Sequence, residues 1–99
     1  MLRLTLIAQT PHQAVLKVDG QITVDQISTL TEEIGRLREQ STSLMLELDN
    51  VSHIDPEGLE LLKQQAGPSL RLRGGSLFLR ALLESNGIEL ADTSREPGQ

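Results

Sequence analysis

Hydrophobic and polar positions alternate in the first part of the chain. Over residues 2–7 a leucine occupies every second position, which is typical of a β-strand with one buried face. The polar segment 10–13 interrupts this pattern, and a second alternating run, residues 14–18, ends at the turn dipeptide Asp19-Gly20. We therefore expect two short strands that pair as an antiparallel hairpin.

The period changes at Val24, where apolar side chains begin to recur every three or four residues. This spacing predicts an amphipathic helix. Thr23 is the expected N-cap, with Asp25 and Ser28 as alternatives, because short polar side chains accept hydrogen bonds from the first free amides of a helix. The stripe expected to face the core comprises Ile27, Leu30, Ile34 and Leu37.

The next segment, residues 43–49, is short and dense in apolar residues, as expected for a central strand covered on both faces. Residues 50–54 are expected to link it to a second helix. That helix should begin at Asp55-Pro56-Glu57, since Asp can cap, Pro suits the first helical position and Glu complements the positive end of the helix dipole. Gly67-Pro68 should end it.

Residues 70–73 alternate again and predict a short strand. Ser76 is a suitable N-cap for a third helix, which would bury Leu79, Leu82 and Leu83 and end at Asn86-Gly87. An alternative interpretation extends the strand through residues 77–79 and leaves only a stub of helix.

The predicted order of elements is β-β-α-β-α-β-α. Helices between strands imply right-handed crossovers, so we expect an α/β fold with a mixed, mainly parallel sheet and helices packed on it. The 99-residue length fits one domain, which we place at residues 1–92. Residues 93–99 are polar, contain Pro and Gly, and are expected to form a flexible tail.

Composition and charge narrow the possible functions. The net charge of −5 disfavours nucleic acid and direct membrane insertion, and Phe78, the single aromatic residue, cannot form a base-stacking surface. The absence of cysteine excludes disulfides, thiolate catalysis and Cys-based zinc sites. No long apolar run or secretory signal is present, so a cytoplasmic location is expected.

Candidate catalytic groups have simpler structural explanations. His53 has no second histidine nearby in the sequence, so we expect a loop residue rather than a base or a metal ligand. Asp55 and Glu57 are better explained as a helix cap and a dipole partner than as paired catalytic carboxylates. Ser52 and Ser76 have no local base. We expect no catalytic residues, no metal and no cofactor.

Three segments carry a resemblance to a known family. They are the turn at residues 18–22, the strand and loop at residues 46–59, and the strand and helix at residues 70–88. Together they resemble the STAS domain shared by bacterial anti-sigma-factor antagonists and the cytoplasmic tails of some anion transporters. The resemblance covers about residues 2–90, and the middle segment is the most specific. It implies a STAS-like fold and favours the helix that starts at Ser76.

The chain departs from the family pattern at the site of regulation. Antagonists of this family carry a phosphorylated Ser or Thr just before the loop glycine, and here that position is Glu57, preceded by Pro56. Thr23 stands where the family has an Asp, and the second helix is shorter than usual. Glu57 has two interpretations that do not exclude each other: a fixed charge that imitates the phosphorylated state, and an ordinary first-turn residue contributing about 0.3–1 kcal/mol through the dipole.

The resemblance implies a protein-binding module that is not switched by phosphorylation at the usual site. Its partner would be an anti-sigma factor or a kinase-like ATPase. An alternative is an accessory subunit of a transport ATPase of the lipid-transport type, and a small-ligand or nucleotide-binding domain ranks last. The expected partner-binding residues are Gly20, Gln21, Ile22, Thr23, His53, Asp55, Pro56, Glu57, Gly58, Leu59 and Leu62.

Overall fold

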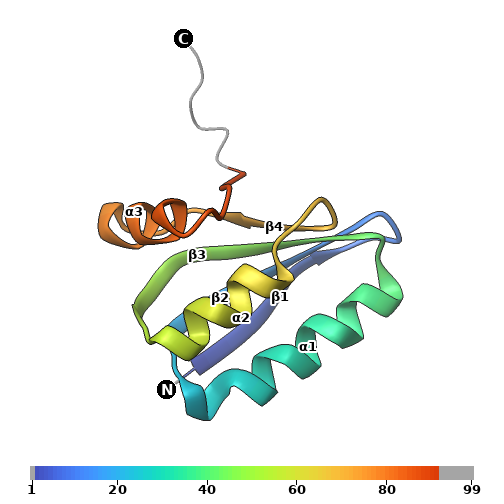
Figure 1. Cartoon of the computed structure of the whole chain (residues 1–99). Helices are drawn as coiled ribbons and strands as arrows, with labels where there is room; N and C mark the ends of the chain where they lie inside the picture. The colour runs from blue at the N-terminus through green and yellow to red at the C-terminus, as the bar shows by residue number, and fades with distance from the viewer. Residues whose placement is uncertain (1, 92–99) are drawn as a thin grey trace, which may run out of the picture.

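A computed structural model describes residues 2–91 of the chain (Figure 1). The order of its elements is the predicted β-β-α-β-α-β-α, with one added 3₁₀ turn, η1, before the first helix. Their bounds are β1 Leu2–Gln9, β2 Gln13–Ile22, η1 Val24–Gln26, α1 Ile27–Gln40, β3 Ser43–Ile54, α2 Pro56–Gln65, β4 Leu70–Arg73 and α3 Leu77–Ser85.

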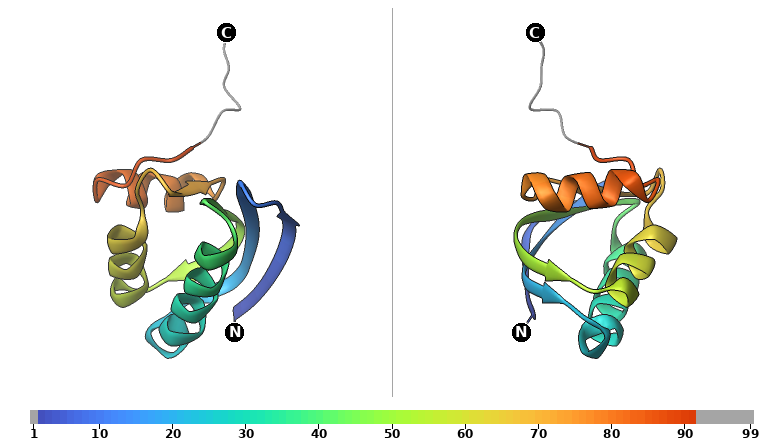
Figure 2. Two further views of the ribbon diagram at one scale, coloured as in Figure 1. Left: turned by 90° about the vertical axis from the view of Figure 1, so that its right-hand side faces the viewer. Right: turned by 60° about the vertical axis from the view of Figure 1, so that its left-hand side comes forward.

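The four strands form one sheet in the order β1-β2-β3-β4. The β1–β2 pair is antiparallel, and the β2–β3 and β3–β4 pairs are parallel. The predicted mixed, mainly parallel sheet is therefore confirmed. Two successive crossovers in the same direction place their helices on the same face, and Figures 1 and 2 show α1 and α2 side by side there. Helix α3 lies next to β4, at the far end of the sheet from β1.

The core lies between the sheet and the helices and is entirely aliphatic. Alternate residues of each strand supply one half, and one stripe of each helix supplies the other, as period-two and helical patterns require. The predicted stripe of α1 is confirmed at Leu30, Ile34 and Leu37. The fully buried large side chains are Leu16, Ile22, Leu30, Ile34, Leu37, Leu44, Leu46, Leu48, Leu62, Leu70, Leu72 and Leu83.

The opposite face of the sheet carries polar side chains in cross-strand register. Lys17 of β2 pairs with Glu47 of β3, and Glu47 pairs with Arg73 of β4, to which it forms an ion pair. Cross-strand pairs of opposite charge stabilise a sheet modestly. The strand residues that point to this face are half-buried or exposed, so among residues 2–91 no helix covers it.

Strands β2 and β3 are longer than the sequence pattern predicts. β2 does not stop at Asp19-Gly20 but continues to Ile22, and the expected link at residues 50–54 is the last part of β3. The pairing shifts register between Lys17 and Asp19 and again after Gly20, whose φ of 100° is one that only glycine adopts easily. These bulges break the alternation and hide the strand ends from a period-two analysis.

The end of the chain confirms the helical interpretation of residues 77–79. Helix α3 begins at Leu77, and the Ser76 hydroxyl accepts a hydrogen bond from the Leu79 amide at 3.1 Å, as an N-cap should. Leu90 then forms a single parallel bridge to Leu72 at the free edge of β4. The predicted tail at residues 93–99 lies outside the described residues.

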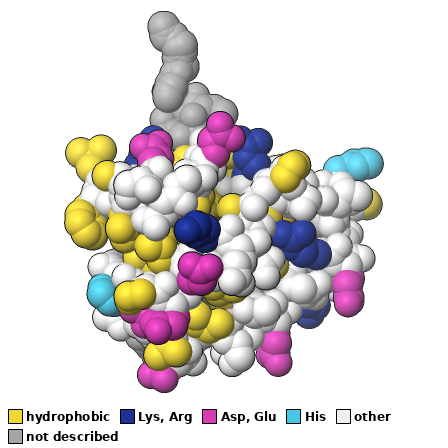
Figure 3. Space-filling model, in the orientation of Figure 1, with side chains coloured by type: hydrophobic (Ala, Val, Ile, Leu, Met, Phe, Trp, Pro, Cys, Tyr) yellow, Lys and Arg dark blue, Asp and Glu magenta, His cyan; other side chains and the backbone are white. Residues whose placement is uncertain are grey.

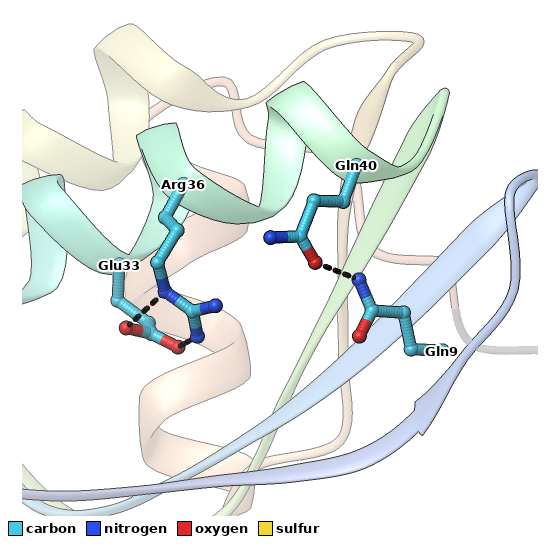
Figure 4. A network of polar contacts seen from close by, with 4 residues as sticks. All are labelled: Gln9, Glu33, Arg36 and Gln40. Carbon is cyan, nitrogen blue, oxygen red and sulfur yellow. Dashed lines mark hydrogen bonds and ion pairs between the residues drawn. The ribbon is translucent and has the colours of Figure 1, made fainter.

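Polar side chains close the edge of the sheet at which β2 and β3 begin. The Thr42 and Ser43 hydroxyls both donate to the His12 carbonyl at 2.9 Å, and the Ser41 hydroxyl donates to the Thr10 carbonyl. The side-chain amide of Gln9 donates a hydrogen bond to the side-chain oxygen of Gln40 and so joins β1 to the end of α1 (Figure 4). We call this region, residues 9–13 and 40–43, the closed edge.

The Glu33–Arg36 ion pair lies on the same helix, further from the closed edge (Figure 4). Its partners are separated by three positions, and Arg36 is half exposed. Such a surface pair contributes little to the stability of the helix, because solvent screens its charges. It is a local feature of α1.

Candidate functional site

Three helices begin at the opposite edge of the sheet, where the parallel strands end. The segments after β2, β3 and β4 lead into α1, α2 and α3, and the three helix starts lie along one side of the molecule (Figures 1 and 2). This region, residues 20–26, 49–59 and 74–82, is called the helix-start edge below. It contains every partner-binding residue predicted from the sequence except Leu62.

Asp55 fixes two of the three helix starts. One carboxylate oxygen accepts the Gly58 amide at 2.8 Å and caps α2, as predicted. The other accepts the Val24 amide at 2.8 Å, at the beginning of η1. The Asp55 amide also donates to the Ile22 carbonyl at 3.1 Å. One residue therefore joins the segment after β2 to the segment after β3.

These contacts favour the ionised form of Asp55. The hydrogen bond from the Gly58 amide lowers the pKa of the Asp55 carboxyl below its usual value. Partial burial opposes this shift, whereas the Val24 amide and the electrostatic effect of nearby His53 add to it. The carboxylate is thus held in the form that accepts both amides.

Thr23 does not cap the first helix, contrary to the prediction. It is extended, with φ −119° and ψ 171°, and its hydroxyl makes no capping hydrogen bond. The Gln26 side chain, which precedes α1, does not cap either. The acceptor comes from Asp55, 31 positions away, so no local signal in the sequence could have identified it.

Gly58 lies where the ends of β2 and β3 approach α2 most closely. A Cβ atom there would lie 2.5 Å from the Ile22 carbonyl oxygen, 2.8 Å from the Ile22 side chain and 3.1 Å from the Ile54 side chain. Real Cβ contacts do not reach the first two distances, so the site requires glycine. Its role is to let α2 begin directly against the sheet.

A second aspartate, Asp49 of β3, holds the third helix start. Asp49 accepts the Gly75 amide at 3.0 Å and so fixes the segment between β4 and α3. Together with Asp55, which follows directly after β3, it links all three helix starts to the last part of this strand. This arrangement follows from the position of β3 between β2 and β4 in the sheet.

Glu57 is exposed in the first turn of α2. Its carboxylate forms no hydrogen bond or ion pair with another residue in the range 2–91. His53 and Gln21 are also exposed, and they are register partners at the ends of β3 and β2. The structure thus brings the predicted partner-binding residues 20–23 next to the first turn of α2, which carries Glu57.

The predicted partner-binding residues differ in exposure: some lie at the surface, and others lie beneath it. Gln21, His53, Pro56 and Glu57 are exposed. Gly20, Thr23, Asp55 and Leu59 are half-buried. Ile22, Gly58 and Leu62 are buried and lie beneath this surface, where they hold its backbone in place.

Sequence analysis missed three exposed apolar residues of this edge. Val24, Leu77 and Phe78 are 57%, 86% and 77% exposed, and each lies at the start of a helix. In Figure 3, hydrophobic side chains gather at the left, over the start of α3, and acidic side chains follow lower on the same side. Helical periodicity gave a signal for α3, because Leu77 and Phe78 fall outside the stripe of Leu79 and Leu83.

Several hollows mark the surface of the described part of the chain. A groove of about 250 Å³ lies at the helix-start edge, between the end of β3 and α3. A larger, open hollow of about 680 Å³ lies elsewhere, where α2 and α3 end, and is lined in part by Lys63, Arg71 and Glu89. Within residues 2–91, no three His, Cys, Asp or Glu side chains come together to hold a metal ion.

The sequence profile of the STAS domain matches residues 5–86. The chain belongs to the STAS-domain family. The predicted family and the predicted STAS-like α/β fold are thereby confirmed. No curated protein sequence matches this STAS domain.

Solved structures with the same fold include SpoIIAA in two forms. The unphosphorylated anti-sigma factor antagonist SpoIIAA is similar with a TM-score of 0.70 and 17% identity, over 94% of this STAS domain and 88% of that chain. The phosphorylated form, the Bacillus cell fate determinant SpoIIAA, gives a TM-score of 0.63 and 17% identity, over 94% and 91% of the two chains. A Shewanella loihica protein with a SpoIIAA-like fold gives 0.58 and 8%, over 95% and 86%.

At these identities the likeness concerns the fold alone. The SpoIIAA structures are described as phosphorylated and unphosphorylated forms of that protein. In this STAS domain, the position expected to correspond to the family phosphosite carries Glu57, which has no hydroxyl group to form a phosphate ester. None of the helices described within residues 2–91 is long and apolar enough to cross a bilayer.

Proposed function

We propose that this STAS domain is a non-enzymatic protein-interaction module that binds its partner through the helix-start edge. The observation that carries the proposal is Glu57, an exposed carboxylate without an internal partner on a backbone that Asp55 and Gly58 hold rigidly. A charge that forms no hydrogen bond or ion pair within residues 2–91 is available to another molecule. The partner, by family resemblance, is an anti-sigma factor or a related kinase-like ATPase.

Glu57 also determines how the interaction is regulated. Because Glu57 has no hydroxyl group, the domain is not switched by Ser or Thr phosphorylation at this position. Glu carries one negative charge and two oxygens, against about −1.5 to −2 charges and three oxygens for a phosphate. Glu57 would therefore bias the domain permanently, and incompletely, toward the state that a phosphorylated relative occupies.

The lack of a phosphoacceptor also favours a second candidate from a different class. A subunit that stays bound to a transport ATPase of the lipid-transport type needs no switch. The two candidates differ in which ATPase the domain binds. Genes next to this one that encode either transport components or a sigma factor and kinase would favour one candidate over the other.

Enzymatic activity is not part of the proposal. The hydroxyls of Ser52 and Ser76 are used within the fold, the first donating to the Gly20 carbonyl and the second capping α3. Asp55 accepts two backbone amides and is not free to act as a base. No nucleophile with an adjacent base is therefore assembled from these candidates.

Binding to purified candidate ATPases tests the proposal. Titration calorimetry would compare wild type with Glu57→Ser and Glu57→Lys, and Glu32→Lys, an exposed charge reversal on α1, would be the control. We expect Glu57→Lys to weaken binding at least about tenfold and Glu57→Ser to change it less, with circular dichroism spectra unchanged. Equal affinities for wild type and both Glu57 variants would contradict the proposal.

A further inference from the structure

Helix α3 exposes two large apolar side chains, Leu77 and Phe78, of a kind that small domains usually bury. Leu77 and Phe78 are 86% and 77% exposed, although Phe78 is the only aromatic residue of the chain. The core is complete without them, because Leu79 and Leu83 anchor α3 from its other side. Neighbouring large apolar side chains that are exposed together are a feature of interaction surfaces.

A groove lies beside these side chains. It has a volume of about 250 Å³ and runs between the last residues of β3 and the first two turns of α3. Its walls include Val51, Ile54, Phe78, Leu79 and Leu82, with His53 at the rim. The space suits one large apolar side chain from outside, with Phe78 as one wall.

Acidic side chains lie elsewhere along the same edge. Asp25 and Glu57 are exposed and make no ion pair with a residue in the range 2–91. These two carboxylates, on a chain with a net charge of −5, can pair with cationic side chains of a partner. A partner segment that reaches from the groove to these carboxylates therefore gains from carrying Lys or Arg.

We infer that the groove between β3 and α3 is the anchoring pocket of the interface, and that it receives a large apolar side chain from a partner segment that also carries Lys or Arg. The inference rests on the proposed function and extends it to the chemistry of the partner. Aromatic side chains dominate binding energy when they lie near the centre of an interface. Phe78 and the groove supply the apolar part of the contact, and Glu57 supplies the charged part.

Two other occupants fit the same surface less well. A stable dimer buries about 800 Å² on each partner, whereas one aromatic side chain contributes about 150–250 Å², so Leu77 and Phe78 alone give too little area. A symmetric contact across the whole edge would bring Asp25 and Glu57 toward their own copies. Anionic lipid would meet the same carboxylates and be repelled.

Random linear peptides displayed on phage are the probe for this inference. Peptides enriched on wild-type protein would be synthesised, and their affinities would be measured for wild type, Phe78→Ser and Glu57→Lys. Ile7→Ser is the matched control, because Ile7 is 51% exposed but lies on β1, away from this edge. We expect enriched peptides to combine an aromatic or large aliphatic residue with Lys or Arg. Phe78→Ser should weaken them at least about tenfold and Ile7→Ser should leave them unchanged.

Several results would overturn the inference. They are peptides that bind Phe78→Ser as tightly as wild type, enrichment of acidic peptides, a dimer in sedimentation that Phe78→Ser abolishes, and Phe78-dependent binding to vesicles of phosphatidylcholine with phosphatidylglycerol. Peptides sensitive to Glu57→Lys but not to Phe78→Ser would keep the proposed role of Glu57 and remove the groove. The reverse pattern would keep the groove and remove the role of Glu57.

Discussion

The two ends of the parallel strands are built on opposite principles. At the closed edge, the hydroxyls of Ser41, Thr42 and Ser43 all donate to backbone carbonyls of the turn between β1 and β2. At the helix-start edge, the backbone is held as firmly, but the exposed side chains include an unpaired carboxylate and large apolar groups. The first edge is complete within the chain, and the second leaves side chains available to another molecule.

The two edges differ in the groups that hold the backbone in place as well as in the side chains that are exposed. The closed edge distributes its hydrogen bonds over several neutral donors. The helix-start edge concentrates them on two carboxylates, Asp49 of β3 and Asp55 just after it. Substitutions that remove support should therefore be costly at the helix-start edge, whereas substitutions of its exposed side chains should not affect stability.

Among the substitutions at the helix-start edge, the largest effect is expected for Asp55→Asn. An amide keeps one acceptor but turns a donor toward the Val24 or Gly58 amide, so one helix start loses its partner. We expect a clear fall in the urea midpoint at neutral pH. Ser43→Ala, at the closed edge, should cost about 0.5 kcal/mol or less, since Thr42 still donates to the same carbonyl. A larger loss for Ser43→Ala would reverse the comparison.

The Asp55 effect should also depend on pH. The pKa of this carboxyl is lower in the folded chain than in the unfolded chain, so its stabilising effect is complete above the ordinary Asp pKa of about 3.9. The effect is lost as the pH falls through the folded-state pKa. Urea unfolding of wild type and Asp55→Asn should therefore differ most at about pH 7 and converge in acid. A constant difference across this range would argue against the ionised acceptor.

A smaller effect is expected for Gly58→Ala. The added methyl group meets the Ile22 carbonyl at 2.5 Å, and relieving such overlap costs about 1–3 kcal/mol, less about 1 kcal/mol gained in helix propensity. The control is Gly35→Ala in α1, where nothing lies within 4 Å of the new atom. It should stabilise the domain by up to about 1 kcal/mol. If both variants were stabilised in urea unfolding, the close approach at α2 would be unimportant.

The smallest effect on stability is expected for Phe78→Ser. Its side chain is 77% exposed, so the free energy of unfolding should change by less than about 0.5 kcal/mol. Leu83→Ala, on the buried side of the same helix, should cost about 2–5 kcal/mol. Thermal unfolding of the two variants measures both values. A large loss for Phe78→Ser would mean that the exposed apolar side chains serve the fold rather than a partner.

The elements that the sequence predicted well have local signals. The start of α2 is marked by Asp55-Pro56, and Asp55 accepts an amide only three positions further on. The start of α3 is marked in the same way by Ser76. The ends of β2 and β3 had no such signal, because bulges at the Lys17–Gln21 segment interrupt the alternation. In the sequence, the part of a strand that follows a bulge does not continue the alternation and therefore resembles a connecting segment.

The candidate site was predicted only in part for a similar reason. Glu57 was found through its place in a family motif, and the turn at residues 20–23 through the same resemblance. The bond from the Val24 amide to Asp55 spans 31 positions and depends on the parallel pairing of β2 with β3. The groove beside Phe78 is likewise formed by segments more than 20 positions apart, and no periodicity within either segment indicates it.

The outer strands of the sheet have a consequence for behaviour at high concentration. β1 carries a bulge between Leu6 and Ala8, and β4 has four residues, with Leu90 bridged to Leu72 on its free side. Short or irregular outer strands are poor templates for the addition of a further strand. Strand exchange and fibre-like growth along the sheet are thus discouraged, and contacts with other proteins are left to side chains rather than to the backbone of a shared sheet.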